Sequence, residues 1–184
     1  MNDRERWDTK YAGAFGSKRT EPNEYVVEWA AGLEGRGRAL DLAAGTGRHA
    51  LHLAQTGWES SAWDVSPVGL EILTVRAREL GVEVATRAVD VLTESLDESE
   101  LGFDLVICVL FLDRSLFNEL HRFVAPGGHL IFSTATEDFS GDKPPSRFRL
   151  QRGELERGVP GFETVKSVEA GGMAGILARR SHRS

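Results

Sequence analysis

The sequence lacks the features that mark several classes of protein. Cys108 is its single cysteine, so no disulfide can form within the chain. No apolar run reaches the length of a transmembrane helix, and the first residues lack the apolar core of a secretory signal. The net charge is -6, and no basic stripe is present to neutralise phosphates. These absences predict a cytoplasmic protein with neither a nucleic-acid nor a membrane partner.

Strand and helix signals alternate along the middle of the chain. Apolar or alternating runs predict strands at residues 38–42, 58–63, 82–89, 103–110 and 129–136. Amphipathic segments predict helices at residues 47–56, 66–80 and 115–124. Two later runs, at residues 162–168 and 173–180, are separated by four residues and predict an antiparallel hairpin. The fold class is therefore α/β, a doubly wound and mostly parallel sheet covered by helices. We expect one domain over residues 1–184, with residues 1–35 as a helical lid or arm and 36–184 as the core.

The most informative run is LDLAAGTGRHALHLA, at residues 40–54. A short strand carrying Asp41 leads into a turn with Gly45 and Gly47, and the turn opens into an amphipathic helix. Glycines let a backbone approach a ligand closely, and the free amides of a helix N-terminus can face that ligand. An acid on the preceding strand favours a cationic ligand over a purely anionic one.

Further acids follow the next strands. Asp64 lies about 20 residues beyond the turn, where an acid can accept from both hydroxyls of a ribose. Asp90 is placed to accept from an adenine amine, with the Val91 amide donating to the ring. Asp41 can attract an ammonium group, and Arg48 can pair with a carboxylate. Together these residues describe a site for a nucleoside that bears an amino acid.

Other interpretations stay open for each motif. Gly45-x-Gly47-x-x-Ala50 also satisfies the dinucleotide fingerprint of an NAD(P)-dependent oxidoreductase, although Asp41 would repel a pyrophosphate. The glycines can form a simple turn, Asp64 can belong to a helix cap, and Asp90 can be a loop acid. His49 and His52 have helical spacing but no third ligand nearby, so we expect no metal site. Cys108 is expected in the core.

At this point the chain resembles the class I SAM-dependent methyltransferases. LDLAAGTGRHALHLA is similar to the first motif of that class, and AWDVSP, RAVDVLT, FDLVICVLFLDRSLF and APGGHLIF resemble the following motifs in order. The likeness covers nearly the whole chain. More narrowly, the chain resembles the TehB-type tellurite-resistance and thiopurine methyltransferase group. It implies a Rossmann-like sheet of seven strands with an antiparallel C-terminal strand. It also implies S-adenosyl-L-methionine as cofactor, with SAH as the product. The predicted cofactor-binding residues are Trp7, Tyr11, Asp41, Ala43, Gly45, Gly47, Arg48, Asp64, Val65, Asp90, Val91 and Val109.

The methyl acceptor is less well defined by the sequence. TehB-type enzymes carry a His/Arg-bearing segment between the last two strands, and here that connection is only four small residues. We expect a small molecule with a soft nucleophile, such as a thiol or a chalcogen oxyanion, because such groups need little base catalysis. Asp113 is the one candidate base, although capping preference favours it as the N-cap of the helix that begins near Ser115. Phe111 and Arg147 are the predicted substrate residues. A catalytically silent domain that binds SAM or SAH is the alternative function, and we expect a monomer or homodimer.

Overall fold

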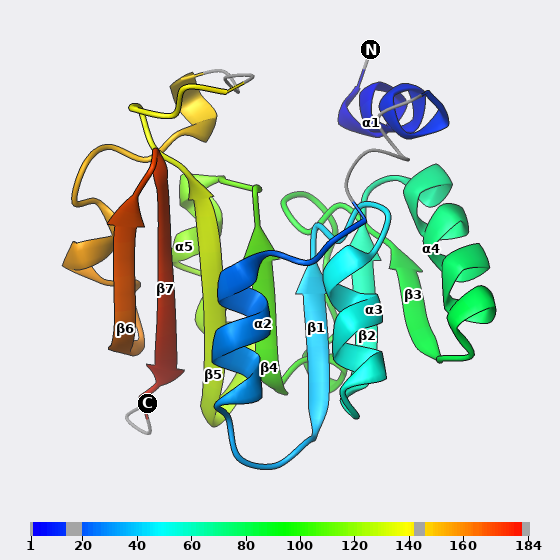
Figure 1. Ribbon diagram of the computed structural model, residues 1–184, viewed down its shortest axis with the longest axis horizontal. Helices are drawn as coiled ribbons and strands as arrows, with labels where there is room; N and C mark the ends of the chain where they lie inside the picture. Colours follow the sequence, from blue (N-terminus) through cyan, green and yellow to red (C-terminus); the bar gives the residue numbers. More distant parts are fainter. Residues whose placement is uncertain (1, 14–19, 142–145, 182–184) are drawn as a thin grey trace. The chain divides into compact units, whose positions relative to one another are not determined.

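A computed structural model describes residues 2–13, 20–141 and 146–181 of the chain. Its sheet has seven strands in the order β3-β2-β1-β4-β5-β7-β6, and helices cover both faces (Figure 1). This confirms the predicted doubly wound, Rossmann-like fold with an antiparallel C-terminal strand. The chain divides into two compact units, at residues 1–96 and 97–184.

The first unit contains the three parallel strands that follow the helical N-terminal region. Strand β1 (Arg38–Leu42) pairs with β2 (Glu59–Asp64), and β2 pairs with β3 (Val84–Ala88). The helices are α1 (Asp3–Ala12), α2 (Glu24–Ala31), α3 (Arg48–Gln55) and α4 (Pro67–Leu80). Leu40, Leu42, Leu53 and Leu73 are fully buried at the centre of this unit. Because its strands are parallel, their carboxyl ends lie along one edge of the sheet.

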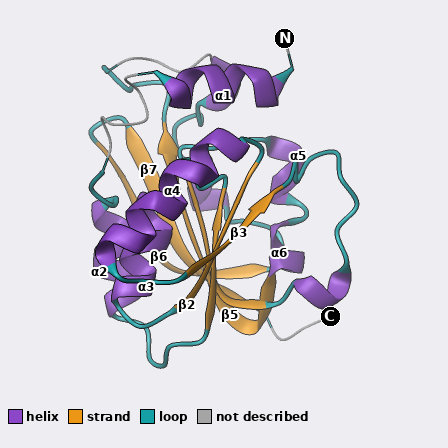
Figure 2. Ribbon diagram, turned by 90° about the vertical axis from the view of Figure 1, so that its right-hand side faces the viewer, coloured by secondary structure: helices purple, strands orange, loops and turns teal. Residues whose placement is uncertain are grey.

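Local signals explain where these helices begin and end. The Ser66 side chain accepts from the Gly69 amide at the start of α4, and Pro67 takes the first helical position. Gly81 ends α4 in the left-handed conformation, with φ 67°. Helix α1 begins with a capping box between Asn2 and Glu5. Figures 1 and 2 both show α1 beside α4, beyond the carboxyl ends of β1 and β2.

The second unit contains β4 (Phe103–Val109), β5 (Val124–Ala135), β6 (Phe162–Ala170) and β7 (Met173–Arg180). Six residues of β4 are buried, as expected for a central strand, and Cys108 is a fully buried core residue. Strands β6 and β7 form an antiparallel hairpin, and β7 pairs antiparallel with β5. The predicted C-terminal hairpin is therefore confirmed.

One predicted helix of this unit is wrong. Residues 115–124 were expected to form a single helix, but the chain forms α5 (Arg114–Phe117) and α6 (Leu120–Phe123). The break falls at Asn118, a residue of low helix propensity, and tight i→i+3 bonds close the turns at Glu119 and Arg122. Strand β5 then begins at Val124, earlier than predicted, and runs through the Pro-Gly-Gly segment. The remaining elements are the short helices η2 (Glu98–Glu100), η3 (Ser146–Phe148) and η4 (Leu155–Arg157).

Candidate functional site

The glycine turn after β1 is built from residues in the left-handed conformation. Ala43, Gly45 and Gly47 have φ values of 58°, 57° and 77°. Such a value is strained for alanine, and strain of this kind is concentrated at functional sites. A Cβ on Gly47 would lie 2.1 Å from Cδ1 of the buried Leu73, so this glycine is required by packing against α4. The turn is thus fixed both by its backbone and by its neighbours.

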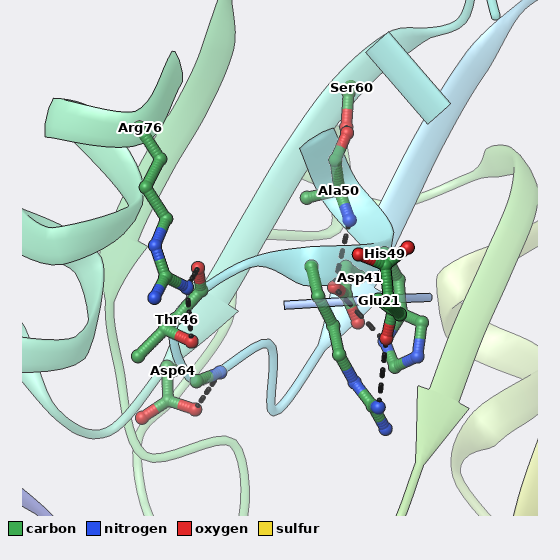
Figure 3. A network of polar contacts seen from close by, with 10 residues as sticks. Glu21, Asp41, Thr46, His49, Ala50, Ser60, Asp64 and Arg76 are labelled. Carbon is green, nitrogen blue, oxygen red and sulfur yellow. Dashed lines mark hydrogen bonds and ion pairs between the residues drawn. The ribbon is translucent and has the colours of Figure 1, made fainter. Parts of the chain in front are cut away.

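Asp64 at the end of β2 is the acid that joins this turn to the sheet. Its Oδ2 accepts from the Gly45 amide at 2.7 Å (Figure 3), and its Oδ1 accepts from the Ser66 amide at 2.8 Å. The residue is only 6% exposed. Burial raises the pKa of Asp64, the two backbone bonds lower it, and the charges of Asp41 and Asp8 raise it, so that the net shift is upward. The carboxylate has about four lone-pair sites, and these two bonds use half of them.

Asp41 is buried more deeply than the sequence suggested. It is 1% exposed, and its Oδ2 accepts from the Ala50 amide in the first turn of α3 at 3.1 Å (Figure 3). His49 Nδ1 lies 3.7 Å from the same oxygen. A carboxylate at a helix N-terminus is stabilised by the helix dipole and by the amides there. Asp41 therefore holds α3 in place, and its predicted contact with an ammonium group stays a prediction.

Helix α1 places Tyr11 against the turn, and Trp7 stacks on Tyr11. Trp7 and Tyr11 stack with their ring centroids 5.5 Å apart. A Cβ on Gly45 would lie 2.6 Å from the Tyr11 hydroxyl oxygen, and one on Gly69 would lie 3.0 Å from the Tyr11 ring. Burial raises the pKa of Tyr11, and the charges of Asp64 and Asp41 raise it further, so the phenol stays protonated.

Two polar contacts fasten α1 to the loop between β2 and α4. Arg4 Nε donates to the Val65 carbonyl at 3.2 Å, and the Ser66 hydroxyl donates to Asp8. Sequence reasoning missed Asp8, Ser66 and Gly69 as partners of this helix. The single available signal was the position of Asp8 directly after Trp7, which is weak without the structure.

Asp90 and Val91 follow β3, the strand that pairs with the one that ends at Asp64. Asp64 is in register with Ala88 of β3, two residues before Asp90. Asp90 Oδ1 accepts from the Leu92 amide at 3.0 Å, which shapes the loop after β3. Within the described residues, the Val91 amide makes no hydrogen bond. An unused amide beside a carboxylate fits the edge of an adenine ring, which both accepts and donates.

Arg48 and Thr46 take part in contacts that secure the turn. Arg48 Nη1 donates to the Glu21 carbonyl at 3.0 Å, so the side chain is directed to the segment before α2. Thr46 is held by Arg76 of α4, whose Nη1 donates to the Thr46 hydroxyl at 3.0 Å (Figure 3). The predicted pairing of Arg48 with a ligand carboxylate stays a prediction, and the contact from Arg76 was not foreseen.

The other predicted residues belong to the second unit. Val109 is buried at the end of β4, and Phe111 is partly buried just after it. Leu110 between them has φ 60°, a second strained position at a strand end. Asp113 caps α5, because its Oδ1 accepts from the Ser115 amide at 2.9 Å and from the Ser115 hydroxyl. Arg147 is exposed, with its guanidinium carbon 4.6 Å from the centre of the Phe148 ring.

The structure brings the predicted cofactor residues of the first unit together at the carboxyl ends of its strands. Asp64 has lone pairs left for the hydroxyls of a ribose, and the Val91 amide has no partner among the described residues. These groups fit an adenosine moiety. In the described part of the chain, no three His, Cys, Asp or Glu side chains are grouped as metal ligands, and no helix is long and apolar enough to cross a membrane.

Comparison with known proteins agrees with this geometry. Residues 39–128 match a family model described as a methyltransferase domain. Ubiquinone biosynthesis O-methyltransferase of Alkalilimnicola ehrlichii is 40% identical over 116 residues, which cover 60% of this chain and 46% of that protein. The chain thus spans about half the length of the curated relatives it matches.

Solved structures share the fold at low sequence identity. TehB from Haemophilus influenzae has a TM-score of 0.73 at 20% identity, over 97% of this chain and 67% of that one. Magnesium protoporphyrin IX methyltransferase from Synechocystis, solved with bound SAH, has a TM-score of 0.65 at 15% identity, over 98% and 100% of the two chains. Residues 39–128, just under half of the chain, therefore resemble a methyltransferase domain, and the strand order is that of the Rossmann-like methyltransferase fold.

Proposed function

We propose that this chain transfers a methyl group from S-adenosylmethionine to a small-molecule acceptor. The observation that carries the proposal is Asp64, a buried carboxylate at the end of β2 that is joined to the glycine turn through the Gly45 amide. A carboxylate in this place, with lone pairs to spare, accepts from the two hydroxyls of a ribose. When bound, the cofactor supplies a methyl group on a positively charged sulfur.

The residues of the first unit have separate tasks in this proposal. Asp64 holds the ribose, and Asp90 with the Val91 amide holds the adenine edge. Asp41 and Asp64 add negative charge next to the turn, which favours a cationic ligand. Since the reaction is an in-line displacement, alignment is the main requirement, and well-oriented reactants gain about 7–11 kcal/mol from it.

Trp7 and Tyr11 are proposed to close over the cofactor. Their helix is fastened to the loop after β2 by Arg4 and Asp8, and the Tyr11 ring lies against Gly45 and Gly69. A ring in this place would exclude water from the bound sulfonium group and slow its release. Helix α1 would then act as the lid of the helical lid or arm that the sequence predicted.

The acceptor atom is proposed to be a soft nucleophile, such as a thiol or a chalcogen oxyanion. Asp113, the one candidate base among the strand-end residues, accepts two hydrogen bonds from Ser115 as the cap of α5. A hydroxyl acceptor needs a base more than a thiol does. The likeness to TehB, at 20% identity, shows the fold alone.

A hydroxyl acceptor is the second candidate, and a specific observation favours it. The relative with 40% identity over 116 residues carries the name O-methyltransferase. In that case a carboxylate must take the hydroxyl proton, and Asp113 would have to exchange its bonds to Ser115 for one to the acceptor. Replacing Asp113 with Asn would then abolish transfer to phenols, whereas a soft acceptor would still be methylated.

The proposal is tested by binding and by turnover. Calorimetry with SAH should show binding, and NAD(P) should not compete, because Asp41 disfavours a pyrophosphate at the start of α3. Transfer of labelled methyl groups is then measured on a panel of thiols, selenite and phenols. Firm SAH binding without transfer to any of them would favour the silent-domain alternative. Absence of SAH binding would contradict the proposal itself.

A further inference from the structure

A hollow of about 610 Å³ lies in the second unit, near the segments that follow β4 and β5. Ligands of doubly wound sheets bind beyond the carboxyl ends of the strands, and pockets for small molecules have about 300–1,000 Å³. The residues that line the hollow are mostly charged or polar: Arg114, Glu137, Ser146, Arg147, Arg149, Leu150, Gln151, Glu154 and Arg157.

The wall of the hollow is firmly attached to the sheet. Leu150 is fully buried and forms a parallel bridge with Thr136, directly after β5. Its amide donates to the Ala135 carbonyl at 2.9 Å, and the Glu137 amide donates back to the Leu150 carbonyl at 2.9 Å. The Arg149 amide donates to the Ser146 carbonyl at 3.0 Å. These bonds hold residues 146–151 in one place, so the side chains on this segment start from fixed positions.

Arg114 forms the frame of the hollow. Its Nε and Nη2 donate to the two carboxylate oxygens of Glu154 at 2.9 and 2.8 Å, and the same guanidinium donates to the Arg147 and Arg149 carbonyls. Burial raises the pKa of Glu154, but hydrogen bonds from Arg114 and the Gln151 amide, with the charge of Arg157, lower it overall. Glu154 therefore stays ionised and neutralises the charge of Arg114. All three nitrogens of the Arg114 guanidinium donate to residues that line the hollow.

The remaining charges of the hollow are mainly positive. Once the charges of Arg114 and Glu154 cancel, the lining holds one acid, Glu137, and three arginines, Arg147, Arg149 and Arg157. This leaves an excess of two positive charges. Among the described residues, Arg147 and Arg157 form no ion pair. Arg149 donates from Nη1 to the Glu137 carbonyl at 3.2 Å, and its buried Nε has no partner in the described part of the chain. A positive hollow is a local exception on a chain whose net charge is -6.

We propose that this hollow binds an anionic group of the methyl acceptor, a carboxylate or a phosphate, and so selects acidic small molecules. The inference rests on the proposed function. Guanidinium groups are planar donors that match the oxygens of both anions, and such charge-assisted bonds are stronger than neutral ones. The hollow thus defines the substrate class through a group that does not itself receive the methyl.

The experiment is calorimetry on the full chain with three probes of similar size: benzoate, phenyl phosphate and the neutral benzamide. Each is titrated with and without SAH. Benzoate or phenyl phosphate should bind, and the preference between them identifies the anion, while benzamide should bind at least about tenfold more weakly. Arg147→Met and Arg157→Met should each weaken anion binding by about tenfold, since each removes one charged donor. Arg152→Met is the matched control, because Arg152 lies outside the lining and pairs with Asp138 at 2.7 Å.

The outcomes separate this inference from the proposed function. The anion site would be overturned if benzamide bound as tightly as the better-bound anion, if neither anion bound, or if Arg152→Met caused an equal loss. If SAH binds and the anions do not, the inference fails alone. If an anion binds as expected and SAH does not bind, the proposed function fails and the hollow remains an anion site. Melting temperatures of the three variants check that each is folded.

Discussion

Asp64→Asn separates the structural from the ligand-binding role of the acid at the end of β2. The wild-type carboxylate accepts from the Gly45 amide at 2.7 Å and from the Ser66 amide at 2.8 Å, one bond to each oxygen. Asparagine offers one oxygen and one NH2 group, so one of the two amides would face another donor. A buried donor left without an acceptor costs about 1–3 kcal/mol.

A second effect of the same substitution works in the opposite direction. Burial and the nearby charges of Asp41 and Asp8 raise the pKa of Asp64, which means that its ionised form is disfavoured in the folded state. Removing that charge recovers part of the lost free energy of unfolding. We expect a net loss of about 0–2 kcal/mol, which lowers the melting temperature of a chain of this size by no more than about 8 °C.

The effect on the cofactor should be much larger. Each ribose hydroxyl that donates to the charged Asp64 contributes about 1.5–3 kcal/mol, as hydrogen bonds to charged groups do. Asparagine keeps at most one neutral acceptor, so the affinity for SAH should fall by about a hundredfold or more. The disparity between a small loss of stability and a large loss of affinity is the specific expectation.

Calorimetry with SAH and thermal unfolding of the same samples measure both quantities. Asp97→Asn is the matched control, because Asp97 caps the short helix η2 in the second unit through Ser99. The reasoning is refuted if Asp64→Asn keeps SAH affinity within about threefold of the wild type, or if Asp97→Asn loses as much.

Three further predictions concern the same turn. Gly47→Ala should lower the free energy of unfolding in urea by about 2–5 kcal/mol, because its Cβ would lie 2.1 Å from Leu73 Cδ1 at φ 77°. The double variant with Leu73→Ala should lose less than the sum of the two single losses. Strictly additive losses would contradict the clash. Tyr11→Ala should speed SAH dissociation in stopped-flow by about tenfold whereas Tyr11→Phe should speed it much less, because phenylalanine keeps the ring that lies against Gly45 and Gly69 and loses only the hydroxyl next to Gly45; equal rates in both would argue against a lid. SAH affinity should rise with pH through the raised pKa of Asp64, because the ionised form accepts the ribose bonds, and Asp64→Asn should remove this dependence in calorimetry. The free energy of unfolding depends on pH in the opposite direction. Because the pKa of Asp64 is higher in the folded chain, the folded chain binds more protons between the unfolded and folded pKa values, and the contribution of Asp64 to the free energy of unfolding falls as pH rises through that window.

The alternation of strands and helices could be predicted because each element carries its own signal. Strand β1 was predicted at its exact bounds, and Ser66, Pro67 and Gly81 marked the two ends of α4. These are local effects of periodicity and capping, which need no knowledge of distant residues. The broken helix at Asn118 was missed because its amphipathic pattern continues across the break, and the pattern outweighed the low propensity of one residue.

The sequence predicted which acids of the candidate site lie at the strand ends, but not the contacts that they make. Parallel strands bring Asp64 and Asp90 to one edge, which follows from topology alone. Other features depend on side chains that lie far apart in sequence. They are the packing of Tyr11 against Gly45, the hydrogen bond from Arg76 to Thr46, and the hollow in the second unit. Such contacts have no periodic signature, so the pattern of the chain could not contain them.

The burial of Asp41 strengthens the argument against a dinucleotide cofactor and changes its basis. From the sequence, Asp41 repels a pyrophosphate simply by standing near the turn. In the structure its carboxylate is 1% exposed and accepts from the Ala50 amide, one of the donors that a phosphate would need at the start of α3. The helix N-terminus is thus partly occupied by an anion that belongs to the chain itself. A ligand at this turn gains little from negative charge and more from hydroxyl and cationic groups, which is the chemistry of a sulfonium nucleoside.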